Sequence, residues 1–295
     1  MTINVLVELS NRNVDKYFTY NVPKNLEDDI KVGIRVKVPF GKQKLEGFVM
    51  EINSEYNLDL KDIDSVVDKD IILNDELIKL GFFLKKKTLC TLISAYQAML
   101  PKALKAQNKT NIGKSYIKIV ELCDVDLSKY KLNSKQLNIV DQIKKGINRK
   151  NDFKSSLSSL KIFFNKGIIK ETLIENFRLK SKNDIDYPIF KLNSEQENAV
   201  NTIFNSDDLV YLLHGVTGSG KTEVYMELIE KMLKLNKTSI VLVPEISLTP
   251  QMTIRFKSRF GDNIAILHSR LSEGEKYDEY RKIARGLVKI VIGAR

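Results

Sequence analysis

Cysteines and long apolar runs are both scarce in this sequence. No run of apolar residues approaches the roughly 20 that a helix needs to cross a membrane, so we expect a soluble, cytoplasmic protein with no membrane partner. The N-terminus lacks a basic stretch followed by an apolar one, which argues against a signal peptide. The two cysteines, Cys90 and Cys123, lie far apart and outside any CxxC pair. This spacing argues against a zinc site or a disulfide framework, and we expect each cysteine to be a small apolar core residue.

Arginine is also scarce, whereas lysine is abundant. The formal net charge is +11, and a basic surplus suggests nucleic acid or another anionic surface as a partner. Because Lys, Asn and Ile are enriched together, as AT-rich coding also produces, the charge alone is weak support for nucleic acid. The arginines are more informative, because six of the ten lie late in the chain: Arg255, Arg259, Arg270, Arg281, Arg285 and Arg295.

Residues 1–105 have the pattern of a small, β-rich domain. Short apolar or alternating stretches separated by turn residues predict strands in "INVLVEL", "YFTYNV", "GIRVKVPFG" and "LEGFVMEI". Apolar residues at helical spacing then predict a helix over 75–100 that stops at Pro101. Its lysines at 85–87 are more often a solvated helix face than a binding patch.

Residues 106–181 have the pattern of a winged-helix-like domain. The polar, basic stretch "KALKAQNKTNIGKS" predicts a linker. A helix follows with Ser134 as its candidate N-cap, then a second helix, a break at Gly167 and a short hairpin. Two helices and a wing are typical of winged-helix domains, whose second helix enters a groove of duplex DNA. A small helical spacer with no role in DNA binding fits the same pattern.

Residues 182–295 begin with a polar linker that ends at Pro188. After it, the spacing of the apolar residues along the chain changes. Apolar runs alternate with helical stretches, the runs being "DLVYLLHG", "TSIVLVPEI", "NIAILHS" and "VKIVIGAR". This alternation predicts an α/β fold with a parallel sheet and helices on both faces.

The stretch "HGVTGSGKTEVY", residues 214–225, fits the phosphate-binding pattern GxxxxGK[ST]. Glycines let backbone N–H groups turn inward around phosphate oxygens, and the following helix adds its positive N-terminal end. We expect a buried strand before the loop, and ATP with Mg²⁺ as its ligands. Lys221 would reach the β- and γ-phosphates and Thr222 would coordinate Mg²⁺, which makes these two the candidate catalytic residues. The candidate nucleotide-binding set is Gly215, Val216, Thr217, Gly218, Ser219, Gly220, Lys221, Thr222 and Glu223.

Gln196, in "KLNSEQENAV", is a further candidate nucleotide-binding residue. It resembles the glutamine that many helicases place against the adenine edge, a position that suits an amide because it both donates and accepts. The same stretch reads as an ordinary helix start, with Ser194 as N-cap and Glu197 as the capping-box acid. The two interpretations are compatible.

Three loops follow predicted strands of the parallel sheet: "VPEISLTPQ", "LHSRLS" and "GAR". Each alone is more often an ordinary loop. Because all three would lie at the carboxyl edge of one sheet, where α/β proteins bind ligands, a groove that tracks a DNA strand is the better interpretation. Thr249, Arg270 and Arg295 are the candidate DNA-binding residues of this edge.

Together, "LNSEQ", "HGVTGSGKTEVY", "LVPEISLTPQ", "LHSRLSEGEKYDEYRKI" and "VIGAR" closely resemble the PriA family of primosomal replication-restart helicases (primosomal protein N′). The likeness extends to "YFTYNVP", "GIRVKVPFGKQKLEGFV" and "MLPKAL". It implies an ATP-dependent, 3′ to 5′ superfamily 2 DNA helicase that recognises stalled or repaired replication forks and restarts replication by primosome assembly. Residues 1–105 would bind a DNA 3′ end, 106–181 would be a winged helix and 182–295 a first RecA-like lobe. Implied partners are forked or single-stranded DNA, single-strand-binding protein and primosome loading proteins.

The same resemblance places Phe18 and Gly41 in a pocket for the DNA 3′ end. Thr19 stands where the family has an acidic residue, and Asp64 stands where it has a lysine. Threonine can still hydrogen-bond a terminal hydroxyl, but a carboxylate at 64 would repel a nearby phosphate.

A phosphate-binding loop also needs a second acid for Mg²⁺, normally at the end of another buried strand. Asp278–Glu279 lies in a polar helical stretch, and Asp75–Glu76 lies in another domain. The resemblance implies an acidic motif, a second lobe with an arginine finger and a cysteine-rich zinc module, all beyond "GAR". We therefore expect a fragment of a helicase that binds nucleotide weakly and does not hydrolyse it. Two alternatives are a stand-alone fork-binding module that does not use ATP and a P-loop NTPase unrelated to nucleic acid.

Overall fold

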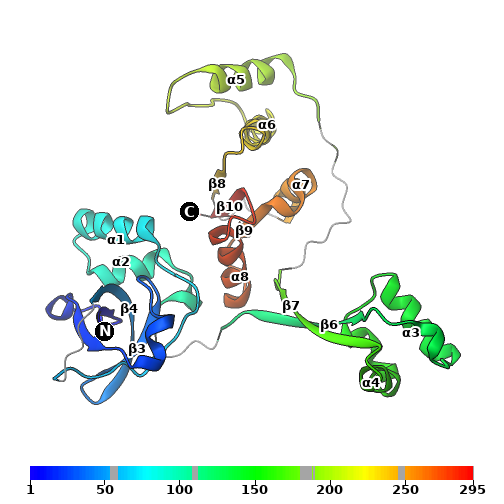
Figure 1. Cartoon of the computed structure of the whole chain (residues 1–295). Helices are drawn as coiled ribbons and strands as arrows, with labels where there is room; N and C mark the ends of the chain where they lie inside the picture. The colour runs from blue at the N-terminus through cyan, green and yellow to red at the C-terminus, as the bar shows by residue number, and fades with distance from the viewer. Residues whose placement is uncertain (54–58, 108–111, 180–187, 189, 245–249, 295) are drawn as a thin grey trace. The chain divides into compact units, whose positions relative to one another are not determined.

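The computed structural model describes residues 1–53, 59–107, 112–179, 188, 190–244 and 250–294 (Figure 1). The chain divides into two compact units, one of Met1–Ile112 with Ser181–Arg295 and one of Gly113–Lys180. None of the helices in the described ranges is long and apolar enough to cross a membrane. Short 3₁₀ helices cover Arg12–Val14, Lys24–Asp29, Lys102–Leu104, Leu127–Lys129, Lys150–Ser156 and Gly261–Asn263.

The N-terminal region, residues 1–107, is built on a five-stranded sheet of order β2-β1-β4-β3-β5 in which every pairing is antiparallel. The four strands predicted from the sequence are confirmed, and the fifth was too short to be recognised. The strands are β1 (Thr2–Val7), β2 (Phe18–Asn21), β3 (Arg35–Phe40), β4 (Gln43–Asn53) and β5 (Ser65–Val66).

Both faces of β1 are buried. Ile3, Val5 and Val7 are at most 1% exposed and belong to one apolar cluster. Leu6 points to the other face and packs in a second cluster with Phe48. Because both faces are covered, "INVLVEL" reads as an almost continuous apolar run rather than an alternating one.

The single helix expected over 75–100 is in fact two helices, α1 (Asp75–Thr88) and α2 (Leu92–Met99). Leu89 has a left-handed backbone (φ 54°), and the Thr91 side chain accepts a hydrogen bond from the first turn of α2. At Gly81 an added Cβ would lie 2.1 Å from Tyr96 Cε1, so only glycine allows the two helices to approach this closely. Because the apolar residues keep their helical spacing across the turn at Leu89, the sequence pattern gave no sign that the helix ends there.

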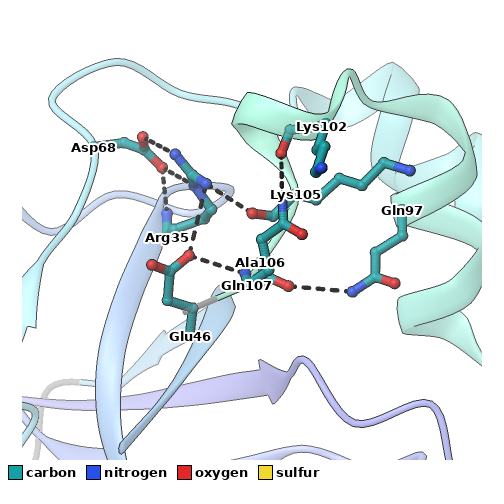
Figure 2. Close-up of polar contacts among 8 residues, drawn as sticks. All are labelled: Arg35, Glu46, Asp68, Gln97, Lys102, Lys105, Ala106 and Gln107. Carbon is teal, nitrogen blue, oxygen red and sulfur yellow. Dashed lines mark hydrogen bonds and ion pairs between the residues drawn. The ribbon is translucent and has the colours of Figure 1, made fainter. Parts of the chain in front are cut away.

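A buried arginine ties the last residues of the N-terminal region to the sheet (Figure 2). Arg35 Nε and Nη2 donate to the two oxygens of Asp68 at 2.7 and 2.8 Å, and Nη1 donates to Lys105 O at 2.8 Å. Gln107 N donates to Glu46 at 3.1 Å, and Gln97 Nε2 donates to Ala106 O at 3.2 Å. The predicted linker "KALKAQNKTNIGKS" is therefore hydrogen-bonded over its first residues, because the buried Arg35 and the half-buried Glu46 and Gln97 satisfy these backbone groups.

The middle unit, residues 113–180, has the order β6 (Ser115–Leu122), α3 (Ser134–Lys144), α4 (Leu157–Asn165) and β7 (Ile169–Asn176). The two helices are confirmed. The hairpin expected after Gly167 is wrong, because β7 is one strand that pairs antiparallel with β6 along its whole length. The helices and strands share a core that includes Val120, Phe153 and Phe163. The N-cap of α3 is Asn133 rather than Ser134, since Asn133 and Gln136 form a reciprocal capping box.

The P-loop region, residues 190–294, contains a three-stranded parallel sheet of order β8-β10-β9. The predicted parallel sheet is thus confirmed for three of its four strands. The elements are α5 (Ser194–Asn205), α6 (Lys221–Lys234), β8 (Ser239–Val243), α7 (Pro250–Phe260), β9 (Ile264–Leu267), α8 (Glu273–Ala284) and β10 (Ile290–Ala294).

The strand expected in "DLVYLLHG" is wrong, because residues 210–215 have no strand structure. Leu209, Val210 and Leu212 are 96%, 87% and 91% exposed. Apolar composition indicates a tendency towards burial, but a parallel strand forms only where distant parts of the chain bring a partner edge to it. The expectation that both cysteines are core residues is also wrong, since each is only half-buried and free.

Candidate nucleotide-binding and DNA-binding sites

The phosphate-binding loop has the backbone that its glycines predict. Gly218 (φ 84°) and Gly220 (φ 81°) both lie in the left-handed region, which other residues adopt only at a cost. Gly220 is also the N-cap of α6, so the loop runs directly into the positive end of that helix. A Cβ at Gly220 would lie 2.2 Å from Gln196 Nε2. The loop therefore requires glycine here for its conformation, and a side chain at this position would also displace the Gln196 amide.

Lys221 folds back over the loop. Its Nζ donates to Gly215 O at 2.6 Å and to Val216 O at 2.8 Å. An ammonium group held on carbonyl oxygens inside a glycine-rich turn is placed to meet the anionic oxygens of a polyphosphate. Thr222 follows in the first turn of α6 and is half-buried. The left-handed glycines, the helix start and the lysine together fit a nucleoside polyphosphate with its divalent cation.

Gln196 contacts the loop from α5. Its Nε2 donates to Ser219 O at 2.9 Å, and its Oε1 accepts from Asn193 N at 2.9 Å. Asn193 is therefore the N-cap of α5 and Gln196 its capping-box partner, which corrects the expectation of Ser194 and Glu197 in these positions. Asparagine accepts the N–H of Gln196 while the glutamine returns a bond to the cap, and this reciprocity sets the helix start. The structure thus brings Gln196 and the loop together.

Glu223 is paired with two arginines of α7. Its carboxylate makes ion pairs with Arg255 and with Arg259 Nη1, the latter at 3.5 Å, and the residue is 6% exposed. Sequence reasoning placed Glu223 in the nucleotide-binding set from its position in the motif. The spacing of Arg255 and Arg259, four residues apart on a helix, was the available signal for its partners.

The acidic pair Asp278–Glu279 is helical, as expected, but it is buried rather than solvated. The two residues are 0% and 1% exposed. Glu279 accepts a hydrogen bond from Ile266 N at 3.0 Å, and Asp278 pairs with Arg281 at 3.4 Å. Through these contacts Glu279 joins α8 to β9, and Asp278 pairs within α8. Within the described ranges, no cluster of three or more His, Cys, Asp or Glu residues could hold a metal ion.

The carboxyl ends of the three parallel strands meet at one edge. Ala294 of β10 lies beside Val243 of β8, and Gly293 lies beside Leu267 of β9. Arg270 follows β9 at this edge and is exposed. The other two candidates at this edge, Thr249 and Arg295, lie outside the described residues.

Phe18 forms an aromatic corner with Phe40 in the N-terminal region. Their rings meet edge to face with centroids 5.1 Å apart, and Lys16 Nζ lies 5.6 Å from the Phe18 ring centre. Gly41 follows Phe40 in the turn between β3 and β4 and has φ 60°, and a Cβ added there would meet no atom within 4 Å. The sequence did not single out Phe40, although its position next to Gly41 was a signal.

Thr19 and Asp64 each have a partner that sequence reasoning missed. Thr19 Oγ1 donates to Asn4 Oδ1 at 2.8 Å, and Asn4 Nδ2 donates to Glu51 Oε2 at 2.6 Å. The strand register places Asn4 opposite both residues. Asp64 forms an ion pair with Lys44, which places a cation beside its carboxylate.

Comparison with known protein families identifies both regions. Residues 4–101 match the 3′DNA-binding domain model, and residues 193–295 match the DEAD/DEAH box helicase model. The chain is thus of the class that joins a DNA-binding domain to a helicase domain.

The chain is also similar to several bacterial proteins named replication restart protein PriA. It is 34% identical to the one from Bacillus subtilis, with 99% of this chain and 46% of the relative aligned. It is 31% identical to that of Chlamydia muridarum (97% and 41%) and 33% identical to that of Haemophilus influenzae (95% and 40%). This chain belongs to the PriA family and matches its N-terminal portion. It spans less than half the length of these relatives.

Proposed function

We propose that this chain supplies DNA 3′-end capture, duplex binding and half of an ATP site to a replication-restart helicase. The observation that carries the proposal is the phosphate-binding loop with Gln196 and Lys221 on it, in one chain with the aromatic corner of Phe18 and Phe40. For the whole protein we propose 3′ to 5′ helicase activity of superfamily 2 in the cytoplasm, fork recognition and primosome assembly. Single-strand-binding protein and primosome loading proteins are the proposed protein partners.

The aromatic corner suits a terminal nucleotide. A half-buried Phe18 ring offers a face for a base, and base stacking on aromatic side chains tolerates any sequence. The Thr19 hydroxyl gives its proton to Asn4 and keeps its oxygen lone pairs, so it accepts the proton of a terminal 3′-hydroxyl. The glycine turn at Gly41 leaves open space beside the corner for the sugar.

ATP with Mg²⁺ is the ligand proposed for the loop. The helicase match implies ATP, and the loop N–H groups, Lys221, Thr222 and Gln196 would hold it. Mg²⁺, when bound, neutralises charge between the phosphates. Lys221 would leave the loop carbonyls for phosphate oxygens, and the Gln196 amide would orient the nucleotide from its place beside Ser219.

Nucleotide hydrolysis is the step we propose to be absent from this chain taken by itself. The acidic pairs Asp75–Glu76 and Asp278–Glu279 both lie on helices, and the second pair is committed to internal contacts. Neither pair stands at the carboxyl end of a strand of the parallel sheet, where an acid for Mg²⁺ would stand.

We propose three domains, with boundaries at 1–105, 106–181 and 182–295. The middle domain would be winged-helix-like and the last a RecA-like lobe. Support for the middle domain is that α3 and α4 pack on a β6–β7 ribbon in a small shared core. We propose that α4 meets duplex DNA, as the second helix does in winged-helix domains.

Binding of a labelled fork with a free 3′ end tests this function. Fluorescence anisotropy would be measured with and without a non-hydrolysable ATP analogue and Mg²⁺, at several salt concentrations. We expect affinity to fall steeply with salt and to change when the analogue is added. Identical affinities with and without the analogue would favour the alternative, a stand-alone fork-binding module that does not use ATP. Helicase-like ATP hydrolysis by the 295-residue chain would contradict the proposed lack of hydrolysis.

A further inference from the structure

Two arginines of α7 hold three glutamates of α6, and we call these five residues the arginine clamp. Glu223, Glu227 and Glu230 lie on one face of α6, while Arg255 and Arg259 are one turn apart on α7. Arg259 Nη2 lies 2.6 Å from Glu227 Oε2 and 2.7 Å from Glu230 Oε2. Glu223 is shared, since Arg255 holds one of its oxygens and Arg259 lies 3.5 Å from the other.

The centre of the clamp is desolvated. The side chains of Arg259 and Glu223 are 9% and 8% exposed. Charges removed from water persist only when they are paired in good geometry, so the two helices cannot slide or rotate without separating these groups. Phe256 and Met226 pack in one apolar core beside the clamp. The planar fork of arginine reaches several carboxylates at once, which a single lysine ammonium cannot do.

The clamp begins two residues after the phosphate-binding lysine. Glu223 lies in the first turn of α6, whose backbone continues directly from the loop. A free carboxylate in this turn would oppose a polyphosphate through like-charge repulsion. The arginines compensate that charge and turn it towards α7, so the positive end of α6 faces the loop alone.

Helix α7 connects the clamp to the carboxyl edge of the parallel sheet. α7 begins at Pro250, after the carboxyl end of β8, and ends at Phe260. Helix α5 also contacts α6 and the loop before it, through Gln196 on Ser219 and through Lys231 Nζ, 4.7 Å from the centre of the Phe204 ring. Helix α6 is therefore supported by two helices, and the clamp is its polar connection to α7.

We propose that Arg259, together with Arg255, is a positioning residue for the polyphosphate of a nucleoside triphosphate. Through Glu223 it holds the first turn of α6 at the orientation in which the loop N–H groups and Lys221 are presented to phosphate. This inference rests on the proposed nucleotide site. It adds a residue group outside the phosphate-binding motif on which that site depends.

Substitution of Arg259 by lysine tests the inference, because it keeps the charge and removes the fork. The matched control is R285K, since Arg285 is exposed and forms an ion pair with Asp70 at 3.5 Å, outside the clamp. Binding of a fluorescent, non-hydrolysable ATP analogue with Mg²⁺ should weaken about tenfold in R259K and stay unchanged in R285K. Wild-type affinity in R259K would overturn the proposal.

Hydrogen exchange without nucleotide separates this inference from the proposed function. Backbone amides of residues 216–224 should exchange faster in R259K than in wild type or R285K, because the first turn of α6 loses its support. Should the wild type fail to bind the analogue while R259K still speeds this exchange, the clamp stands and the proposed nucleotide site fails. Unchanged exchange at 216–224 in R259K would show that the arginine clamp does not support the first turn of α6.

A second variant guards against misfolding of R259K. E223Q keeps the shape of the side chain and removes its charge, and it should speed exchange in the same segment. In the double variant E223Q/R259K the loss of analogue affinity should be smaller than the sum of the single losses, because both changes break one network. Fully additive losses would show that Arg259 does not act through Glu223.

Discussion

The two sheets of the larger unit differ in how completely they are covered. In the antiparallel sheet, β1 is buried on both faces, with Ile3 and Val5 at 0% exposure. In the parallel sheet, the edge strand β8 leaves Ile240 73% and Leu242 64% exposed. Antiparallel strands close through short turns, whereas parallel strands need distant partners. The candidate DNA 3′-end site is thus built on a sheet whose strand β1 is buried on both faces, whereas the nucleotide loop is held mainly by polar contacts from its neighbouring helices.

The largest contrast should appear in the apolar packing of the two sheets. Phe48→Ala removes a fully buried ring that packs edge to face on Tyr96, with centroids 6.1 Å apart, and should lower the free energy of unfolding by about 3–5 kcal/mol. Leu242→Ala at the open edge should change it by less than about 0.5 kcal/mol. Urea unfolding followed by circular dichroism measures both. Equal losses would contradict the difference in coverage.

The buried polar network of the N-terminal region should give the next largest effect. Asp68→Asn keeps the shape of a side chain that is 11% exposed but weakens its paired bonds to Arg35, at a cost of about 2 kcal/mol. Asp70→Asn is the control, because the Asp70 side chain is 60% exposed and surface pairs contribute about 0–1 kcal/mol. Urea unfolding of both variants makes the comparison. A loss in D70N as large as that in D68N would show that burial of the network does not matter.

Loss of the aromatic corner should affect binding more than folding. Phe18→Ala should weaken binding of single-stranded DNA with a free 3′ end about tenfold, since stacking contributes about 1–3 kcal/mol per base. Phe83→Ala removes an exposed phenylalanine of α1, 56% exposed, and should leave binding unchanged. Anisotropy with 3′-hydroxyl and 3′-blocked oligonucleotides measures the effect. Similar losses in both variants would remove the special role of Phe18.

The smallest effect should be the dependence of the clamp on pH. Hydrogen bonding from Arg259 is the main cause that holds the pKa of Glu230 below its ordinary value of 4.5. A carboxylate with a depressed pKa in the folded state stabilises the fold above its unfolded-state pKa, and this stabilisation is lost as pH falls through the folded-state value. The free energy of unfolding should therefore fall less below pH 4.5 in E230Q than in wild type. Parallel pH profiles of urea midpoints would contradict this prediction.

Local patterns predicted the elements that depend on neighbouring residues. Strands β1 to β4, helices α3 to α8 and the glycine conformations of the loop follow from spacing, turns and caps over a few residues. The errors in the number and pairing of the elements share a cause, since each needed a distant contact, whereas the two misplaced N-caps, Ser134 and Ser194, were local errors of one residue. The close approach of α1 and α2 depends on Gly81 against Tyr96, and β7 pairs with a strand that precedes both helices of its unit.

For the candidate sites, the sequence by itself determined which residues form the loop, because glycine at positive φ and a lysine at the helix start are local requirements. Only the tertiary structure decided the partners of the side chains. It turned Glu223 to Arg259, set Gln196 on Ser219, paired Asp64 with Lys44 and buried Asp278 and Glu279. The physical reason is the distance along the chain over which each interaction acts. Backbone conformation depends on residues within one turn, whereas the partner of a charged side chain depends on which distant element packs against it.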